Sequence, residues 1–160
     1  MISITIICVG KMKEKFYISA AEEYLKRLGA YAKTEIVELA EVRLPDDPSG
    51  GDIDSALSRE AAAIKAKIPK GAAIAAMCIE GAQPDSVGFA EMLKKYADGG
   101  ISKICFIIGG SFGLHDSIKA LADAKISMSR MTFPHHLARV MLLEQIYRGF
   151  KILEGGKYHK

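Results

Sequence analysis

Short apolar runs alternate with amphipathic stretches along the whole chain. Runs rich in β-branched residues predict buried strands, and apolar residues spaced three or four apart predict helices. The expected strands are 2–9, 34–39, 72–79, 103–108 and 125–128, and the expected helices are 14–28, 52–68, 86–96, 116–122 and 135–153. This alternation predicts an α/β fold with a mainly parallel sheet flanked by helices on both faces.

Polar residues mark where several helices begin. Asp52 or Asp54 is expected to serve as the N-cap of the second helix, and Ser86 or Asp85 as the N-cap of the third. The preceding segment 41–51 contains prolines, glycines and aspartates, and it is therefore predicted to be a loop.

A glycine-rich segment follows the fourth expected strand. Residues 106–114 read FIIGGSFGL, so Gly109, Gly110 and Gly113 lie just past the carboxyl end of that strand. Ligands of open α/β sheets bind at this edge, and glycine lets a backbone approach them closely. The segment has neither the dinucleotide fingerprint nor the Lys-Ser/Thr of a P-loop. It is interpreted as a ligand loop, with a tight strand-to-helix turn as the alternative.

Two further loops follow expected strands at the same edge. Residues 80–84 follow the third strand, and residues 129–134 follow the fifth. Because parallel strands bring their carboxyl ends together, these two loops and the glycine-rich segment are expected to form one pocket.

Length and composition indicate a single globular domain over residues 1–160, with 49% hydrophobic residues and enough chain for a sizeable core. No apolar run is long enough to span a membrane, and the apolar start of the chain resembles a strand more than a signal peptide. The expected location is therefore the cytoplasm.

Cys8, Cys78 and Cys105 lie in strand-like runs without C-x-x-C spacing, which indicates free thiols. The histidines lack metal-ligand spacing, so no metal is expected.

Positive charge is concentrated near the carboxyl terminus. The net charge is only +3, but residues 125–160 contain seven basic and two acidic residues. This distribution suggests an anionic partner, with nucleic acid first, and a solvated helix face is the alternative that charge alone does not displace. The segment 11–15 is also basic, and solvent exposure is its preferred interpretation.

The last expected helix is apolar on more than one face. Its sequence HHLARVMLLEQIYRGF predicts burial on two sides, which favours packing against a second subunit. A homodimer is therefore predicted, and a central helix within a monomer is the alternative.

Several segments resemble one known family along the whole chain. They are IICVGKMKEKFY, AEEYLKRL, FIIGGSFGLH, SMSRMTFPHH, RVMLLEQIYRGFKI and the terminal YHK. They resemble the ribosomal RNA large subunit methyltransferase H family, the small single-domain branch of the SPOUT (α/β-knot) methyltransferases. The resemblance implies a C-terminal deep trefoil knot, which general fold rules would not predict. It also implies S-adenosylmethionine as cofactor and a homodimer that methylates N3 of a pseudouridine in 23S rRNA within the assembled 70S ribosome.

The same resemblance implies the cofactor-binding residues. They are Met77, Gly109, Met128, Ser129, Arg130, Met131, Thr132 and Phe133. Met77 stands where the family usually has leucine, and this near-isosteric change should preserve the contact with adenine.

The acceptor side of the reaction needs help because an imide N–H is a poor nucleophile until its proton leaves. Tyr158 and His159 are the first candidates, since the family's tail carries this pair and histidine titrates near neutrality. The alternative for the tail is a disordered end. His135 is the second candidate, and its alternative role is to start the last helix. No residue is assigned as the general base, and the reaction need not use one.

Two arginines of the last helix complete the candidate set. Arg139 and Arg148 are expected to contact phosphate or the subunit interface, because arginine does not deprotonate in proteins. Glu144 is expected to pair with one of them in the dimer.

Other classes of protein remain as alternatives. A dinucleotide enzyme would need a glycine fingerprint after the first strand, and Val9-Gly10-Lys11 does not provide it. A non-catalytic ribosome-binding protein with an occluded pocket, or a knot methyltransferase with a different RNA acceptor, is not excluded.

Overall fold

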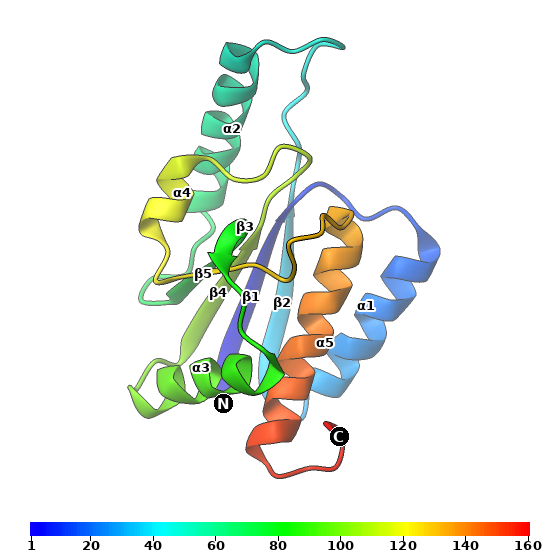
Figure 1. Cartoon of the computed structure of the whole chain (residues 1–160), viewed down its shortest axis with the longest axis vertical. Coiled ribbons are helices and arrows are strands. Elements are labelled where there is room, and N and C mark those ends of the chain that lie inside the picture. Colours follow the sequence, from blue (N-terminus) through cyan, green and yellow to red (C-terminus); the bar gives the residue numbers. More distant parts are fainter.

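The alternation of strands and helices is present in the computed structural model, which describes residues 1–160 (Figure 1). The strands are β1 (Ile2–Val9), β2 (Ala32–Leu39), β3 (Ala73–Ala82), β4 (Lys103–Ile108) and β5 (Ala124–Ile126). The helices are α1 (Lys15–Leu28), α2 (Gly50–Lys65), α3 (Ser86–Asp98), α4 (Asp116–Leu121) and α5 (His135–Leu153).

A single sheet contains all the strands. Its order is β2-β1-β4-β3-β5, and every strand pairing is parallel. The α/β prediction is therefore confirmed. Because the strands run the same way, the loops that follow β1, β3, β4 and β5 all leave the sheet at one edge.

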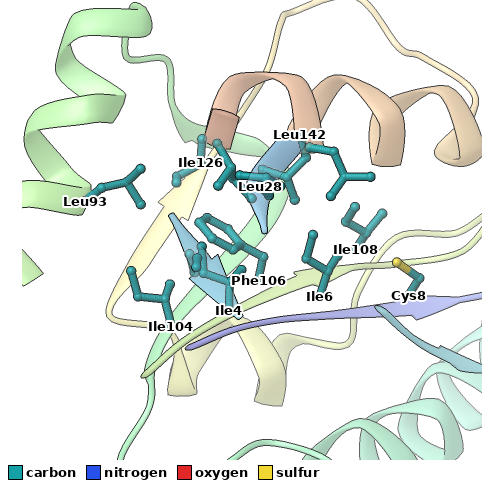
Figure 2. Close-up of a cluster of buried hydrophobic side chains, with 14 of the residues drawn as sticks. Ile4, Ile6, Cys8, Leu28, Leu93, Ile104, Phe106, Ile108, Ile126 and Leu142 are labelled. Carbon is teal, nitrogen blue, oxygen red and sulfur yellow. The ribbon is translucent and has the colours of Figure 1, made fainter. Parts of the chain in front are cut away.

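Helices cover both faces of the sheet. In Figure 1, α1 and α5 lie together on one side and α2 and α4 on the other. Successive residues of a strand face opposite sides, so Ile6 and Phe106 belong to the core under α5, whereas Ile7 and Ile107 belong to the core under α2 and α4. Figure 2 shows the first of these cores, where Phe106 lies among aliphatic side chains below Leu142 of α5. None of the helices is long and apolar enough to cross a bilayer.

The starts of two helices differ in detail from expectation. Ser49, and not Asp52 or Asp54, is the N-cap of α2; its hydroxyl accepts a hydrogen bond from the Asp52 amide at 3.1 Å, and the Asp52 carboxylate accepts one from the Ser49 amide at 2.9 Å. This reciprocal capping box moves the helix start back to Gly50. At α3, Asp85 is the cap, as one of the two alternatives predicted.

The third strand is longer than predicted, since it continues through residues 80–82. The pairing between β3 and β5 skips from Met77 to Ala82, which pairs with Ile126, and the Ser127 amide donates to the Ala82 carbonyl at 2.8 Å. Gly81 permits this approach because a Cβ there would lie 2.6 Å from backbone atoms of Ile126. The predicted loop 80–84 is therefore strand in its first half. The knot requires a backbone crossing of this kind, but the threading itself stays a prediction.

One charged side chain lies inside the core. Arg139 of α5 is only 2% exposed, and its guanidinium donates to the Glu38 carboxylate at 2.6 Å and to the Gly10 carbonyl at 3.0 Å. Glu38 also accepts from the Met12 amide at 2.7 Å. Burial tends to raise the pKa of Glu38, but the bonds from Arg139 and Met12 hold it below its ordinary value. The cluster ties α5 to β2 and to the loop after β1.

Replacing Arg139 should therefore cost stability. Arg139→Ala leaves the Gly10 carbonyl and the Glu38 carboxylate without their main partner, and we expect the free energy of unfolding to fall by about 2–4 kcal/mol. This loss of stability is at the low end of the range for breaking a buried ion pair, because the Glu38 side chain is 34% exposed. Urea unfolding would measure the change, with exposed Arg130→Ala as a control expected to stay within about 0.5 kcal/mol of wild type. Equal stability of the two variants would contradict this account.

Candidate functional site

A pocket lies at the carboxyl edge of the sheet, with a volume of about 780 Å³. Its walls come from the end of β3, from the glycine-rich loop 109–114, from the loop 127–134 and from the first turn of α5. The predicted pocket is confirmed for two of the three loops, 109–114 and 129–134. Of the predicted loop 80–84, only Glu80 lines this pocket, and it belongs to β3. A second hollow of about 430 Å³ shares Met77 and Met128 with this pocket and extends between α3 and α5.

The glycine-rich loop folds back on itself. Gly110 and Gly113 form an antiparallel bridge, and the Gly113 amide donates to the Gly110 carbonyl at 3.1 Å. Gly109 is buried beneath this turn, where a Cβ would collide with the Gly113 carbonyl. The loop is therefore both a tight turn and a pocket wall, so the two interpretations of this segment are not exclusive.

Hydroxyl groups hold the loop that precedes α5. The buried Ser127 hydroxyl donates to the Ser129 carbonyl at 3.0 Å and accepts from the Gln83 amide side chain at 3.2 Å. The Ser129 hydroxyl accepts from the Met131 amide at 3.0 Å. Internal bonds of this kind fix the backbone of the loop against the end of β3 before any ligand binds.

Most of the predicted cofactor residues line this pocket. They are Met77, Gly109, Met128, Ser129, Met131, Thr132 and Phe133. Arg130 does not line it and is exposed. A side chain in a tight loop can leave the wall while its neighbours remain, and sequence spacing does not show which one does so.

An ion pair at the pocket edge was not predicted. Lys119 of α4 pairs with Glu80 of β3, and both line the pocket. The hydrogen bond from Lys119 lowers the pKa of Glu80, and the same bond raises the pKa of Lys119, so both stay charged at neutral pH. The two residues are distant in sequence, and only the position of α4 beside β3 brings them together.

His135 also lines the pocket, as the first residue of α5. Burial, with the nearby His136 next in importance, lowers the pKa of His135 below its ordinary value. The ring is therefore neutral at pH 7 and retains a nitrogen that can accept a proton or a hydrogen bond. His135 therefore starts the helix, as one alternative predicted, and also lines the pocket, while its part in the reaction stays a prediction.

The tail lies away from the pocket. The Tyr158 hydroxyl donates to the Glu144 carboxylate at 3.2 Å, and the Arg148 guanidinium lies over the Tyr158 ring at 4.7 Å. His159 is exposed, with its Nδ1 3.4 Å from an Arg148 nitrogen. No residue after α5 lines either hollow. Along α5, the twelve residues from His135 to Tyr147, against which Tyr158 packs, correspond to about 18 Å.

The Tyr158 hydroxyl is a donor at neutral pH. Burial, followed by the negative charge of Glu144, raises the pKa of Tyr158 to about 12. A phenol with this pKa does not act as a base near pH 7, but it can donate a hydrogen bond.

The two arginines of α5 have different partners. Arg148 pairs with Glu144 of the same chain at 2.5 Å, so the expected pairing of Glu144 is present one helical turn away. Arg139 is buried and pairs with Glu38, so its guanidinium is not available to a phosphate. The expectation of a phosphate or interface contact at Arg139 is wrong; burial within the chain explains its charge instead.

Comparison with known proteins finds relatives along almost the whole chain. A family model described as "Predicted SPOUT methyltransferase" matches residues 2–159. Ribosomal RNA large subunit methyltransferase H of Bacillus pumilus (strain SAFR-032) is 46% identical over 158 residues, covering 99% of both chains. The protein of the same name from Listeria monocytogenes serotype 4a (strain HCC23) is 44% identical over 158 residues, with the same coverage.

A solved structure shares the fold. It belongs to a "probable methylase family protein" of Haemophilus influenzae Rd KW20, with a TM-score of 0.56 and 14% sequence identity. The match covers 98% of this chain and 70% of that one, and at this identity it supports the fold alone. With the family model matching almost the whole chain, and with relatives of such high identity and coverage, the chain belongs to the SPOUT methyltransferase family and, within it, to the group called ribosomal RNA large subunit methyltransferase H.

Proposed function

We propose that this protein is an S-adenosylmethionine-dependent rRNA methyltransferase. In the finer form of the proposal, a homodimer methylates N3 of a pseudouridine in 23S rRNA of the assembled 70S ribosome. The observation that carries the proposal is the pocket between the end of β3, the glycine-rich loop and the loop before α5, in a chain 46% identical over nearly its full length to a protein named ribosomal RNA large subunit methyltransferase H. The acceptor nitrogen and the assembled ribosome rest on the family resemblance.

The pocket fits S-adenosylmethionine in size and chemistry. Ligand pockets usually have volumes of about 300–1,000 Å³ and largely apolar linings with a few polar groups. Here half of the lining residues are hydrophobic, and the glycine loop and the loop 127–134 offer backbone polar groups. Met77 and Met128 provide adaptable thioether side chains for a flat ring. When bound, the cofactor would supply an activated methyl group on its sulfonium sulfur.

The chain's own residues then have to align and activate the acceptor nitrogen. Alignment is the larger task because the methyl group is already activated. Neutral His135, on the pocket wall, is placed to accept the proton that leaves the imide nitrogen. A protonated Tyr158 hydroxyl is suited to stabilise the negative charge that spreads to a neighbouring carbonyl oxygen, provided that the tail reaches the pocket.

A second subunit could bring the tail residues to a pocket that they do not line within one chain. Within one chain, Tyr158 and His159 do not line the pocket, so the proposal places the tail of one copy at the pocket of its partner. Ile79, Phe112 and Met131 line the pocket and are 64%, 50% and 73% exposed, which leaves apolar surface at its mouth for that partner to cover.

The apolar pattern of α5 supports the dimer less than expected. No residue from His135 to Ile152 is fully exposed even in one chain, and α5 shares the core with Phe89 and Leu93 of α3 and with Leu28 of α1. The alternative of a central helix therefore explains the pattern without a partner. The proposed dimer rests instead on the pocket mouth, the position of the tail and the family.

A non-catalytic ribosome-binding protein is less well supported. Such a protein would require a blocked pocket, whereas this one opens to solvent between the glycine loop and the loop before α5. The fold also lacks a glycine fingerprint after β1, where a dinucleotide enzyme would need it.

The reaction itself can be tested with labelled S-adenosylmethionine. Ribosomes from a strain lacking the activity would be offered as 70S particles, as separated subunits and as naked 23S rRNA. We expect label in large-subunit rRNA only from 70S particles, because the family resemblance implies that the assembled ribosome is the substrate. Mapping of the label by mass spectrometry should place it on N3 of a pseudouridine. Labelled naked RNA would contradict the need for the ribosome, and absence of label with all three substrates would contradict the proposed reaction.

The tail should be needed for methylation and not for cofactor binding. Deletion of residues 158–160 should leave cofactor affinity, measured by calorimetry, within about twofold of wild type and lower methyl transfer by at least about 100-fold. Lys157→Ala serves as a control because its exposed side chain has no bonded partner. A deleted enzyme with normal turnover would show that the tail has no part in the reaction.

Co-expression tests whether the tail acts on the partner's pocket. Gly109→Val should block the glycine loop, and it would be combined with the subunit that lacks residues 158–160. Each variant alone should be inactive, but random mixing should restore about a quarter of wild-type activity, since half of the dimers then hold one complete site. If the mixture is as inactive as its components, the tail does not work across the interface.

A further inference from the structure

The glycine-rich loop is held from outside by an acidic residue that lies far away in sequence. Glu41 follows β2, and its carboxylate oxygen Oε1 accepts a hydrogen bond from the Ser111 amide at 3.0 Å. The same carboxylate lies directly over Gly110, where a Cβ would come within 2.7 Å of Oε1. Gly110 and Ser111 both line the pocket, whereas Glu41 does not. Glu41 therefore contacts the back of the pocket wall.

The acceptor in this exposed contact is a charged group. A carboxylate that accepts from a backbone amide makes a charge-assisted hydrogen bond, which is roughly twice as strong as a neutral one. No lysine or arginine pairs with Glu41. The Ser111 amide thus has this carboxylate as its bonded partner, in a loop that is otherwise closed only by its own bridge between Gly110 and Gly113.

A second acidic residue fixes the backbone beside Glu41. Glu60 of α2 is 7% exposed, and its carboxylate accepts from the Val42 amide at 2.8 Å. Burial, opposed by the bond from Val42 and reinforced by the charge of Glu41, raises the pKa of Glu60. A poorly solvated carboxylate with one amide donor is costly to bury. The burial of the Glu60 carboxylate is explained if its function is to hold the Val42 backbone in a fixed position.

We propose that Glu41 is a positioning residue that holds the glycine-rich loop in the shape that receives the cofactor, and that Glu60 acts through Glu41 by fixing its backbone. The inference rests on the proposed function, because it concerns the same pocket. The path runs from the buried face of α2, through the loop after β2, to the amide of Ser111 and the pocket wall.

The test compares two substitutions at one position. Glu41→Ala removes the acceptor, whereas Glu41→Gln keeps an oxygen that can accept from the Ser111 amide. Asp46→Ala is the matched control, since Asp46 is an exposed acidic residue of the same loop with no bonded partner. Calorimetry with S-adenosylmethionine and with its demethylated product would give the affinities. We expect Glu41→Ala to weaken binding about tenfold, and Glu41→Gln and Asp46→Ala to stay within about threefold of wild type.

Two further measurements separate positioning from general damage. Hydrogen exchange should show loss of amide protection in residues 109–114 of Glu41→Ala, with unchanged protection in the central strands. In methylation assays, KM for the cofactor should rise about tenfold, while KM for the ribosome stays at its wild-type value. If Glu60 acts only through Glu41, the Glu60→Ala/Glu41→Ala double variant should bind the cofactor no more weakly than Glu41→Ala alone.

Several results would overturn the inference. Wild-type affinity in Glu41→Ala would show that the bond to Ser111 does not matter for the pocket. Equal loss in Glu41→Ala and Glu41→Gln would show that the charge, and not the hydrogen bond, is what counts. Failure of the wild-type protein to bind S-adenosylmethionine would remove the proposed function and this inference with it, and that result is distinct because it appears before any substitution is made.

Discussion

The parallel pairing of β3 with both β4 and β5 decides where the pocket lies. Because the three strands run side by side in one direction, the segments that follow them leave the sheet at the same edge and meet there. The glycine-rich loop, the end of β3 and the loop before α5 become the walls of one cavity. Gly81 permits the close approach of β3 to β5, since any side chain at that position would strike the backbone at Ile126.

Two charged side chains, the buried Arg139 and the exposed Glu41, connect this edge to other parts of the chain. Arg139 joins α5 to the ends of β1 and β2, and Glu41 joins the loop after β2 to the glycine-rich loop. Both contacts link segments separated by long stretches of sequence, and both end on backbone polar groups near the pocket. A methyl transfer that depends mainly on alignment requires walls of this stiffness more than it requires strong acids or bases. The neutral His135 and the protonated Tyr158 fit such a mild role.

The tail and the pocket occupy different regions of the chain. Tyr158 packs on Tyr147 and Arg148, while the pocket begins at the opposite end of α5. In the proposed dimer, a second copy would cover the exposed apolar side chains at the pocket mouth. The tail is held by only a few polar bonds, so it could move to the pocket of that copy. The proposed dimer is thus a consequence of where the functional groups lie, and the apolar pattern of α5 is already satisfied by α1 and α3.

The sequence by itself determined the elements and their order, because strand and helix periodicity are local properties of the chain. It also located the glycine-rich loop at a strand end, and the resemblance supplied seven residues that line the pocket. Only the tertiary structure decided the burial of Arg139, the pairing of Lys119 with Glu80, the contact of Glu41 with Ser111 and the absence of Arg130 from the pocket lining. These depend on which strands become neighbours and on how closely two backbones pass. Such long-range contacts produce no periodic pattern in the sequence. A charged residue that the local pattern places on the surface can be buried when a partner from a distant part of the chain pairs with it.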